Sequence, residues 1–156
     1  MNLKQSLIDN DSIRLHQTAA TWQEAIKIAV DPLIQSGAVE ARYYDTIIKC
    51  INEMGPYIIL APGLAMPHAR PEDGVKRTAF SLVTLAAPIY FEGEDDPVDV
   101  LIALAGSDSD QHMQGLMEIT QVLDDPDSET GVDLDKIRRC KTADDVYAVI
   151  DAALNG

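Results

Sequence analysis

The apolar run over residues 98–105, VDVLIALA, constrains the fold of this 156-residue chain more than any other feature. Asp99 is its one polar residue, and a nearly continuous run of this kind is typical of a strand in a sheet that is covered on both faces. Further strands are predicted over residues 78–85 and, as a short alternating run, over residues 13–16. The chain must therefore supply helices to both sides of a small sheet.

Helices are predicted on both sides of these strands in the sequence. Thr21-Trp22-Gln23-Glu24 has the pattern of a capping box, which starts a helix that ends near Gly37. Further helices are predicted over residues 39–53, 111–123, 134–140 and 142–154. Residues 106–110 supply N-cap residues for the helix over 111–123, and Thr142-Ala143-Asp144-Asp145 resembles a second capping box. The expected fold is an α/β (α+β) sandwich, in which a small mixed β-sheet is flanked by helices on both faces.

We expect one domain over residues 1–156, with a core from about residue 7 to 154, because no repeat or Gly/Ser linker divides the chain. No apolar stretch approaches the ~20 residues that a membrane-spanning helix needs. The first residues lack an apolar signal segment. The prediction is a protein that stays in the cytoplasm without direct membrane insertion.

The net charge of −14 makes nucleic acid a poor partner, because a phosphate backbone would be repelled. The acidic residues gather in two clusters, whose members are Glu92, Glu94, Asp95, Asp96 and Asp99, and then Asp124, Asp125, Asp127, Glu129, Asp133 and Asp135. Two interpretations stay open, namely solvated loops that keep the protein soluble and surfaces that steer a basic protein partner.

The segment over residues 55–74 is a stiffened loop, since it holds four of the chain's eight prolines. His68 lies in its middle, after Pro67 and shortly before Arg70. A rigid loop lowers the cost of orienting a reactive side chain. Of the three histidines, His16 receives no predicted role and His112 falls in the first turn of a predicted helix, where free amides attract anions.

These residues point to phosphoryl chemistry at His68. A neutral imidazole nitrogen attacks phosphorus when the proton on the other nitrogen is held by an acceptor. His112, Arg70 and nearby backbone amides would then donate to the phosphoryl oxygens.

Other chemistries have less support. No zinc motif is present, so a metal site would need His68, His112 and distant carboxylates. No nucleotide-binding fingerprint occurs, and no cofactor is expected. Cys50 and Cys140 are interpreted as buried structural thiols, and Arg138 and Arg139 give only a faint indication of a reactive Cys140.

The segment Ala61-Pro62-Gly63-Leu64-Ala65-Met66-Pro67-His68 resembles the active-site segment of the mannitol/fructose-type IIA components of the bacterial phosphoenolpyruvate-dependent sugar phosphotransferase system. The later His112-Met113-Gln114-Gly115-Leu116-Met117 is similar to the second histidine segment of this family. The closest likeness is to L-ascorbate-specific members, carried by Gly55-Pro56-Tyr57, Arg70-Pro71-Glu72 and Asp96-Pro97-Val98-Asp99.

The resemblance implies that His68 accepts a phosphoryl group from the phosphocarrier HPr and donates it to a cysteine of a IIB component, with a membrane IIC component downstream. His112 would stabilise the phosphoryl group. Mannitol-type members carry an arginine where this chain has Asn52, and two interpretations of Arg70 stay open, namely a replacement for that arginine and a surface residue. Two alternatives remain, namely a regulatory module of the same fold that moves no sugar and a metal-dependent enzyme.

Overall fold

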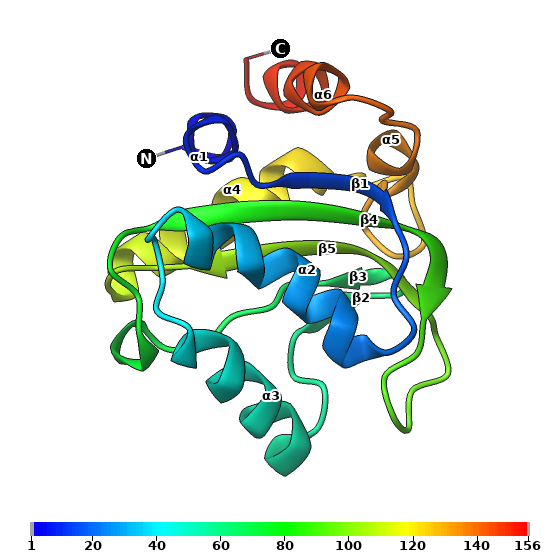
Figure 1. Cartoon of the computed structure of the whole chain (residues 1–156). Coiled ribbons are helices and arrows are strands. Elements are labelled where there is room, and N and C mark those ends of the chain that lie inside the picture. Colours follow the sequence, from blue (N-terminus) through cyan, green and yellow to red (C-terminus); the bar gives the residue numbers. More distant parts are fainter. Residues whose placement is uncertain (1, 156) are drawn as a thin grey trace.

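A computed structural model, which describes residues 2–155, contains a five-stranded sheet with the strand order β1-β4-β5-β3-β2 (Figure 1). The strands are β1 (Ile13–Gln17), β2 (Ile59–Ala61), β3 (Leu64–Ala65), β4 (Ala79–Ile89) and β5 (Val98–Ala105). Strands β4 and β5 are antiparallel, as are β2 and β3, whereas β1 pairs with β4 and β3 pairs with β5 in parallel. The predicted mixed sheet is confirmed.

Helices lie on both faces of this sheet (Figure 1). Helices α2 (Trp22–Gln35) and α3 (Arg42–Met54) cover one face. The other face carries α1 (Leu3–Asp9), α4 (Ser109–Leu123), α5 (Asp135–Arg138) and α6 (Ala143–Asn155). The predicted α/β sandwich is therefore correct, and each side of the sheet has its own apolar core.

Strand β5 lies inside the sheet and is buried on both faces. Leu101 and Ala103 belong to the core under α2 and α3, while Val100 and Ile102 belong to the core under α4 and α6. Successive side chains of a strand point to opposite faces, so both cores need apolar residues from this one strand. This packing is the physical reason for the apolar run in the sequence.

The predicted helix caps are present. The Thr21 hydroxyl accepts from the amide of Glu24 at 3.2 Å, and the Glu24 carboxylate accepts from Ala20 at 2.8 Å, one residue before the cap. At α6, Thr142 and Asp145 exchange the two bonds of a full capping box. Asp108 caps α4 by accepting from the amide of Gln111 at 2.8 Å.

The structure differs from the predicted elements in one missed helix and in several boundaries, among them the end of β4, which lies at Ile89 rather than at residue 85. Helix α1 was not predicted, because its seven residues give only Leu3 and Leu7 as a periodic signal, and both are buried. Helix α3 begins at Arg42 rather than at residue 39, since Val39 forms a β-bridge with Val75. Helix α5 has four residues, so Cys140 lies beyond its end.

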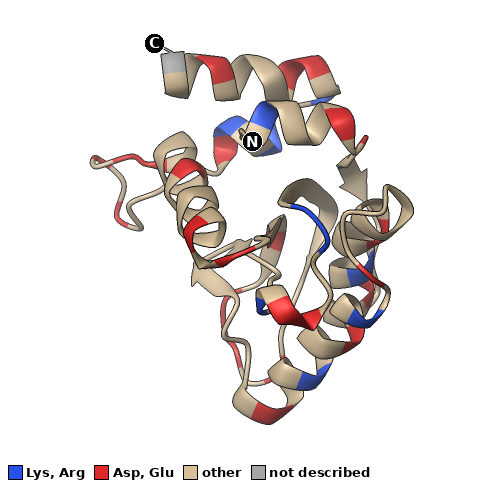
Figure 2. Cartoon of the chain, turned by 90° about the vertical axis from the view of Figure 1, so that its left-hand side faces the viewer, with Lys and Arg blue, Asp and Glu red and all other residues tan. Residues whose placement is uncertain are grey.

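The two acidic clusters are joined by a basic side chain. Arg138 donates to both carboxylate oxygens of Asp99, each at 2.8 Å, and to Asp135 at 3.0 Å. Figure 2 shows the other acidic residues spread over helices and loops, with few Lys or Arg between them. Among residues 2–155, no helix has the length and apolarity needed to cross a bilayer.

Candidate functional site

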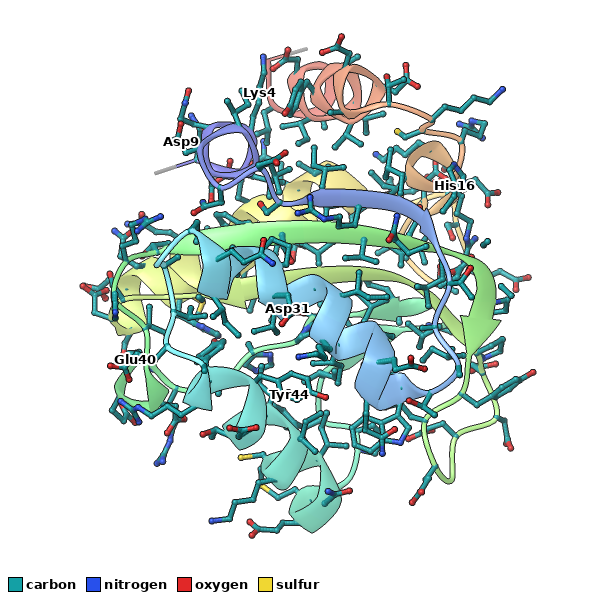
Figure 3. All side chains as sticks on the ribbon, viewed as in Figure 1. Lys4, Asp9, His16, Asp31, Glu40 and Tyr44 are labelled. Carbon is teal, nitrogen blue, oxygen red and sulfur yellow. The ribbon has the colours of Figure 1, made fainter. Side chains whose placement is uncertain are left out.

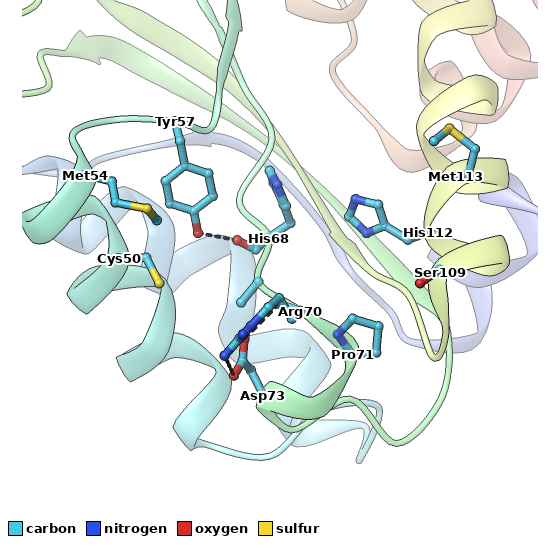
Figure 4. Close-up of a pocket in the computed structure, with 11 residues that line it drawn as sticks. Cys50, Met54, Tyr57, His68, Arg70, Pro71, Asp73, Ser109, His112 and Met113 are labelled. Atoms are coloured by element: carbon cyan, nitrogen blue, oxygen red, sulfur yellow. Dashed lines mark hydrogen bonds and ion pairs between the residues drawn. The ribbon is translucent and has the colours of Figure 1, made fainter.

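The main chain around His68 is fixed by the sheet. The amide of Met66 donates to the carbonyl of Ile58 at 2.8 Å, and the amide of Leu104 in β5 donates to the carbonyl of Pro67 at 3.0 Å. The stiff proline segment is thus attached to the central strand next to β3. This attachment holds His68 at the edge of a pocket rather than on a free loop (Figure 4).

The imidazole of His68 has a defined tautomer. Its Nδ1 lies 2.7 Å from the carbonyl oxygen of Met66. Because a carbonyl oxygen only accepts, Nδ1 carries the proton and the lone pair is on Nε2. Burial lowers the pKa of His68 below its ordinary value, while the bond to Met66 acts in the opposite direction. The ring is therefore neutral near pH 7, with Nε2 available as a nucleophile.

The second histidine, His112, lies beside the first. The ring centroids of His68 and His112 are 5.3 Å apart, and the planes are tilted by 51°. Gly106 permits this approach, since a Cβ there would lie 2.7 Å from the Cα of His112. Burial, and then the charge of His68, lower the pKa of His112. The sequence predicted the two histidines as partners, and the fold brings them together.

The pocket has a volume of about 620 Å³ and is walled by three parts of the chain (Figure 4). Helix α3 contributes Cys50 and Met54, and helix α4 contributes Ser109, His112 and Met113. The segment between α3 and β4 supplies the remaining wall, which consists of Tyr57, His68, Ala69, Arg70, Pro71 and Asp73. A half-buried nucleophile in an open pocket of this size is accessible to a group carried by another protein.

Arg70 is the only basic side chain among the residues that line this pocket. Its Nε lies 3.3 Å from the carboxylates of both Glu72 and Asp73, and its side chain stays exposed. Burial raises the pKa of Asp73, but the side-chain and main-chain hydrogen bonds of Arg70 together hold it below its usual value. A guanidinium anchored by two carboxylates thus lies on the wall of the pocket that His68 also lines.

Comparison with known proteins identifies the family. The chain matches the family described as phosphoenolpyruvate-dependent sugar phosphotransferase system, EIIA 2, over residues 6–153. The chain belongs to this EIIA family. The family predicted from the residues around His68 and His112 is confirmed.

Individual relatives of this EIIA protein cover nearly its whole length. The ascorbate-specific PTS system EIIA component of Salmonella choleraesuis (strain SC-B67) is 49% identical over 153 residues, which are 97% of this chain and 96% of the relative. A putative PTS IIA protein from Streptococcus mutans has a TM-score of 0.89 and 43% identity, covering 100% and 97% of the two chains. The mannitol-specific cryptic phosphotransferase enzyme IIA of Escherichia coli has a TM-score of 0.83 and 30% identity, covering 97% and 99%.

Asn52 of this EIIA protein does not line the His68 pocket. It lines a separate hollow with Trp22 and Phe91. Residues 50 and 54, one helical turn apart, are the ones that α3 presents to the pocket. A residue two positions from Cys50 is rotated by about 200° around the helix, so Asn52 lies on a different side of α3 from the His68 pocket.

The sequence did not predict two residues of this site. Tyr57 donates to the carbonyl of His68, and Asp73 accepts from the amide of Arg70, three residues earlier in the chain. The position of Tyr57 directly after Gly55-Pro56, at the start of the stiff segment, is the one sequence signal that could have indicated it. Cys50, expected in the core, is half-exposed on the pocket wall.

The remaining candidates lie outside the pocket. The Nε2 of His16 is 2.9 Å from the carbonyl of Cys140, near α5 (Figure 3). Burial raises the pKa of the Cys140 thiol, and the charge of Asp145 raises it further. The charge of Arg139 acts in the opposite direction but does not lower the pKa below its ordinary value, so the thiol is not activated. Within residues 2–155, no three His, Cys, Asp or Glu side chains gather as a metal site would require.

Proposed function

We propose that this EIIA protein carries phosphoryl groups in the cytoplasm between HPr and a IIB component, with His68 as the carrier. The observation that supports this role most directly is the bond between His68 Nδ1 and the Met66 carbonyl, which leaves the lone pair of Nε2 free. The chain belongs to a family of components of the phosphoenolpyruvate-dependent sugar phosphotransferase system. His68 lies in the segment that resembles the active-site segment of this family.

The transfer requires no proton movement at His68. The Nε2 lone pair attacks the phosphorus atom of phospho-HPr, an Nε2–P bond forms, and the donor P–N bond breaks with its electron pair returning to the HPr imidazole. Nδ1 keeps its proton, and the Met66 carbonyl stabilises the positive charge that the ring acquires. In the second step the thiolate of the IIB cysteine attacks phosphorus, and neutral His68 is released.

His112 and Arg70 stabilise the charge of the phosphoryl group in this proposal. A neutral His112 ring offers one N–H donor, and its neighbour His68 is 5.3 Å away. Arg70 supplies the positive charge that family members obtain from an arginine on the preceding helix. Its anchoring carboxylates, Glu72 and Asp73, bind it at 3.3 Å, so a dianion on Nε2 competes with them for the guanidinium.

The partners dock on an apolar rim around the pocket. Three exposed methionines form this methionine rim, namely Met54 and Met113 on the pocket wall and Met117 about one helical turn beyond Met113, with exposed fractions of 66%, 55% and 64%. Met54 lies on α3 and Met113 on α4, on opposite sides of His68 (Figure 4). Flexible Met side chains adapt to more than one surface, which suits a carrier that binds HPr and IIB in turn.

The transported sugar is L-ascorbate in this proposal, with a membrane IIC component downstream of IIB. The support comes from the relatives at 48–49% identity over 97% of the chain, which are named ascorbate-specific. We do not adopt the regulatory alternative, because these relatives are named as transporter components.

A phosphotransfer assay tests the proposal. Purified protein is incubated with labelled phosphoenolpyruvate and the general carrier proteins, and acid-labile, alkali-stable phosphate is counted. We expect one phosphate per wild-type chain, none in His68→Ala and full labelling in His16→Ala, whose ring lies outside the pocket. Undiminished labelling of His68→Ala would refute the carrier role.

The sugar is tested with the same labelled chain. Purified IIB components of ascorbate and mannitol transporters are offered separately, and we expect faster transfer to the ascorbate IIB. Equal or faster transfer to the mannitol IIB would overturn the ascorbate assignment.

A further inference from the structure

Two tyrosine hydroxyls hold the peptide bond that follows His68. The hydroxyl of Tyr57 donates to the carbonyl oxygen of His68. The hydroxyl of Tyr43 accepts from the amide of Ala69, at 2.9 Å, and donates to the carbonyl of Leu104 in β5, at 3.0 Å. Both ends of the His68–Ala69 peptide are therefore bound by side chains, one from helix α3 and one from the start of the same segment.

Tyr57 also contacts the imidazole. The ring centroids of Tyr57 and His68 are 5.2 Å apart with an interplanar angle of 79°, which is an edge-to-face arrangement. His112 lies on the other side of His68, so the reactive ring stands between two aromatic neighbours (Figure 4). Tyr43 is buried beneath the segment, whereas Tyr57 is half-buried and lines the pocket.

The Tyr57 hydroxyl is a permanent donor. Burial raises the pKa of Tyr57 well above its ordinary value, and the charges of neighbouring groups act in the same direction. The hydroxyl thus stays protonated over the whole physiological range. Its hydrogen bond to a carbonyl, which only accepts, has one possible direction.

We propose that Tyr57 is a positioning residue for the phosphoryl transfer, holding His68 by its main-chain carbonyl and by its ring so that Nε2 stays directed into the pocket. This inference rests on the proposed function of His68. With the carbonyl fixed by Tyr57 and Nδ1 fixed by the carbonyl of Met66, the imidazole has little freedom to turn away from the incoming phosphorus. Tyr57 acts through the orientation of His68, so we expect its loss to change the rate of the chemical step and not the affinity for the carrier.

Three variants separate the contribution of the Tyr57 hydroxyl from that of the Tyr57 ring. Tyr57→Phe keeps the ring contact and removes the hydroxyl, while Tyr57→Leu removes both. Tyr44→Phe is the matched control, because the Tyr44 hydroxyl also donates to a main-chain carbonyl, that of Gln23 at 3.1 Å, outside the pocket (Figure 3). Rates of phosphorylation by phospho-HPr are measured over a range of carrier concentrations, which gives kcat and KM separately.

We expect Tyr57→Phe to lower kcat about fivefold, as for the loss of one hydrogen bond, with KM unchanged. Tyr57→Leu should lower kcat about 50-fold, since the ring contact is lost as well. Tyr44→Phe should retain both constants. Wild-type kcat in Tyr57→Phe and Tyr57→Leu would overturn the inference, and if Tyr57→Leu does not fold, Tyr57→Phe alone decides.

A second measurement is independent of phosphoryl transfer. The ¹⁵N signals of the His68 ring in the unphosphorylated protein report which nitrogen carries the proton. We expect the Nδ1–H tautomer alone in the wild type and in Tyr44→Phe, and a mixture of tautomers in Tyr57→Leu. An unchanged single tautomer in Tyr57→Leu would contradict the positioning role, whereas failure of the wild type to accept phosphate would contradict the proposed function instead.

Discussion

The ring of His112 lies 5.3 Å from the ring of His68, centroid to centroid, although the two residues stand on different elements. Burial lowers the pKa of each ring, and the charge of His68 lowers the pKa of His112 further. Two neutral imidazoles side by side offer one nucleophile and one N–H donor. A phosphoryl group on His68 Nε2 is therefore placed next to a donor that needs no protonation.

His112→Ala should slow phosphorylation of His68 about 100-fold, the usual effect of removing one donor to a developing negative charge. The phosphate should still be found on His68. His112→Gln retains an N–H donor and should recover part of the rate. Both are measured with labelled phosphoenolpyruvate, and an unchanged rate in His112→Ala would show that the second histidine does not stabilise the transfer.

The rate of phosphorylation should depend on pH through His68. Its pKa in the folded protein lies below the ordinary value of about 6.5, so the neutral nucleophile persists to lower pH than in an exposed histidine. We expect a constant rate from pH 8 to about 6.5 and a decrease below that range. An NMR titration of the ring checks this directly, and a midpoint above 6.5 would contradict it.

The same shift predicts how stability varies with pH. As the pH falls through about 6.5, the unfolded chain binds a proton at His68 before the folded protein does, so the free energy of unfolding decreases. The decrease ends below the folded pKa, where both states are protonated. Urea unfolding of the wild type and His68→Gln between pH 5 and 8 measures the contribution, and equal pH dependence in the two proteins would contradict it.

The sequence predicted those parts of the structure that depend on hydrogen bonds between residues close in the sequence or on a regular pattern of buried apolar residues. Strand β5 is buried on both faces, and this burial requires the apolar run of residues 98–105. The caps at Thr21, Asp108 and Thr142 are hydrogen bonds between residues close in the sequence. The chemistry of the rigid loop favoured His68 among the three histidines, and the family resemblance then assigned roles to His68 and His112, because Pro-His-Ala-Arg alone is too short to specify a chemistry.

The remaining parts depend on tertiary contacts that leave no periodic pattern. The bond of Tyr57 to the His68 carbonyl joins two loop residues, and nothing in the sequence marks a tyrosine as a donor to that oxygen. Asn52 shows a different limit, since a shift of one residue along a helix turns a side chain by about 100° and thus to another surface. Asn52, the position at which mannitol-type members carry an arginine, lies two residues from Cys50 and lines a different hollow from the His68 pocket.

Loss of the Arg70 charge should destabilise the phosphorylated protein more than the unphosphorylated one. Removing its charge in Arg70→Gln should lower the transfer rate about tenfold and shorten the lifetime of the phosphorylated protein, because the phosphoryl dianion loses its guanidinium. Arg14→Gln is the control, since Arg14 lies on β1 and donates to the carbonyls of Asp11 and Ile13. Equal lifetimes in Arg70→Gln and the wild type would rule out the contact.

Gly63 should be far less tolerant of alanine than Gly93. Both have positive φ, +91° and +79°, but a Cβ at Gly63 would lie 2.7 Å from Nη2 of Arg138, whereas no atom lies within 4 Å at Gly93. Gly63→Ala should therefore displace the Arg138–Asp99 pair and lower the free energy of unfolding by about 2 kcal/mol, against about 1 kcal/mol for Gly93→Ala. Urea unfolding measures both, and equal losses would show that the pair adapts freely.

The methionine rim should govern docking without affecting the chemistry. Met54→Glu and Met113→Glu place a charge on exposed positions, so the free energy of unfolding should stay the same while KM for phospho-HPr rises about tenfold through loss of apolar contact. Ile8→Glu is the matched control, because Ile8 is 44% exposed on α1, away from the pocket. If KM rises equally in the control, the effect comes from net charge. If KM is unchanged in Met54→Glu and Met113→Glu, the partners approach His68 without using the rim.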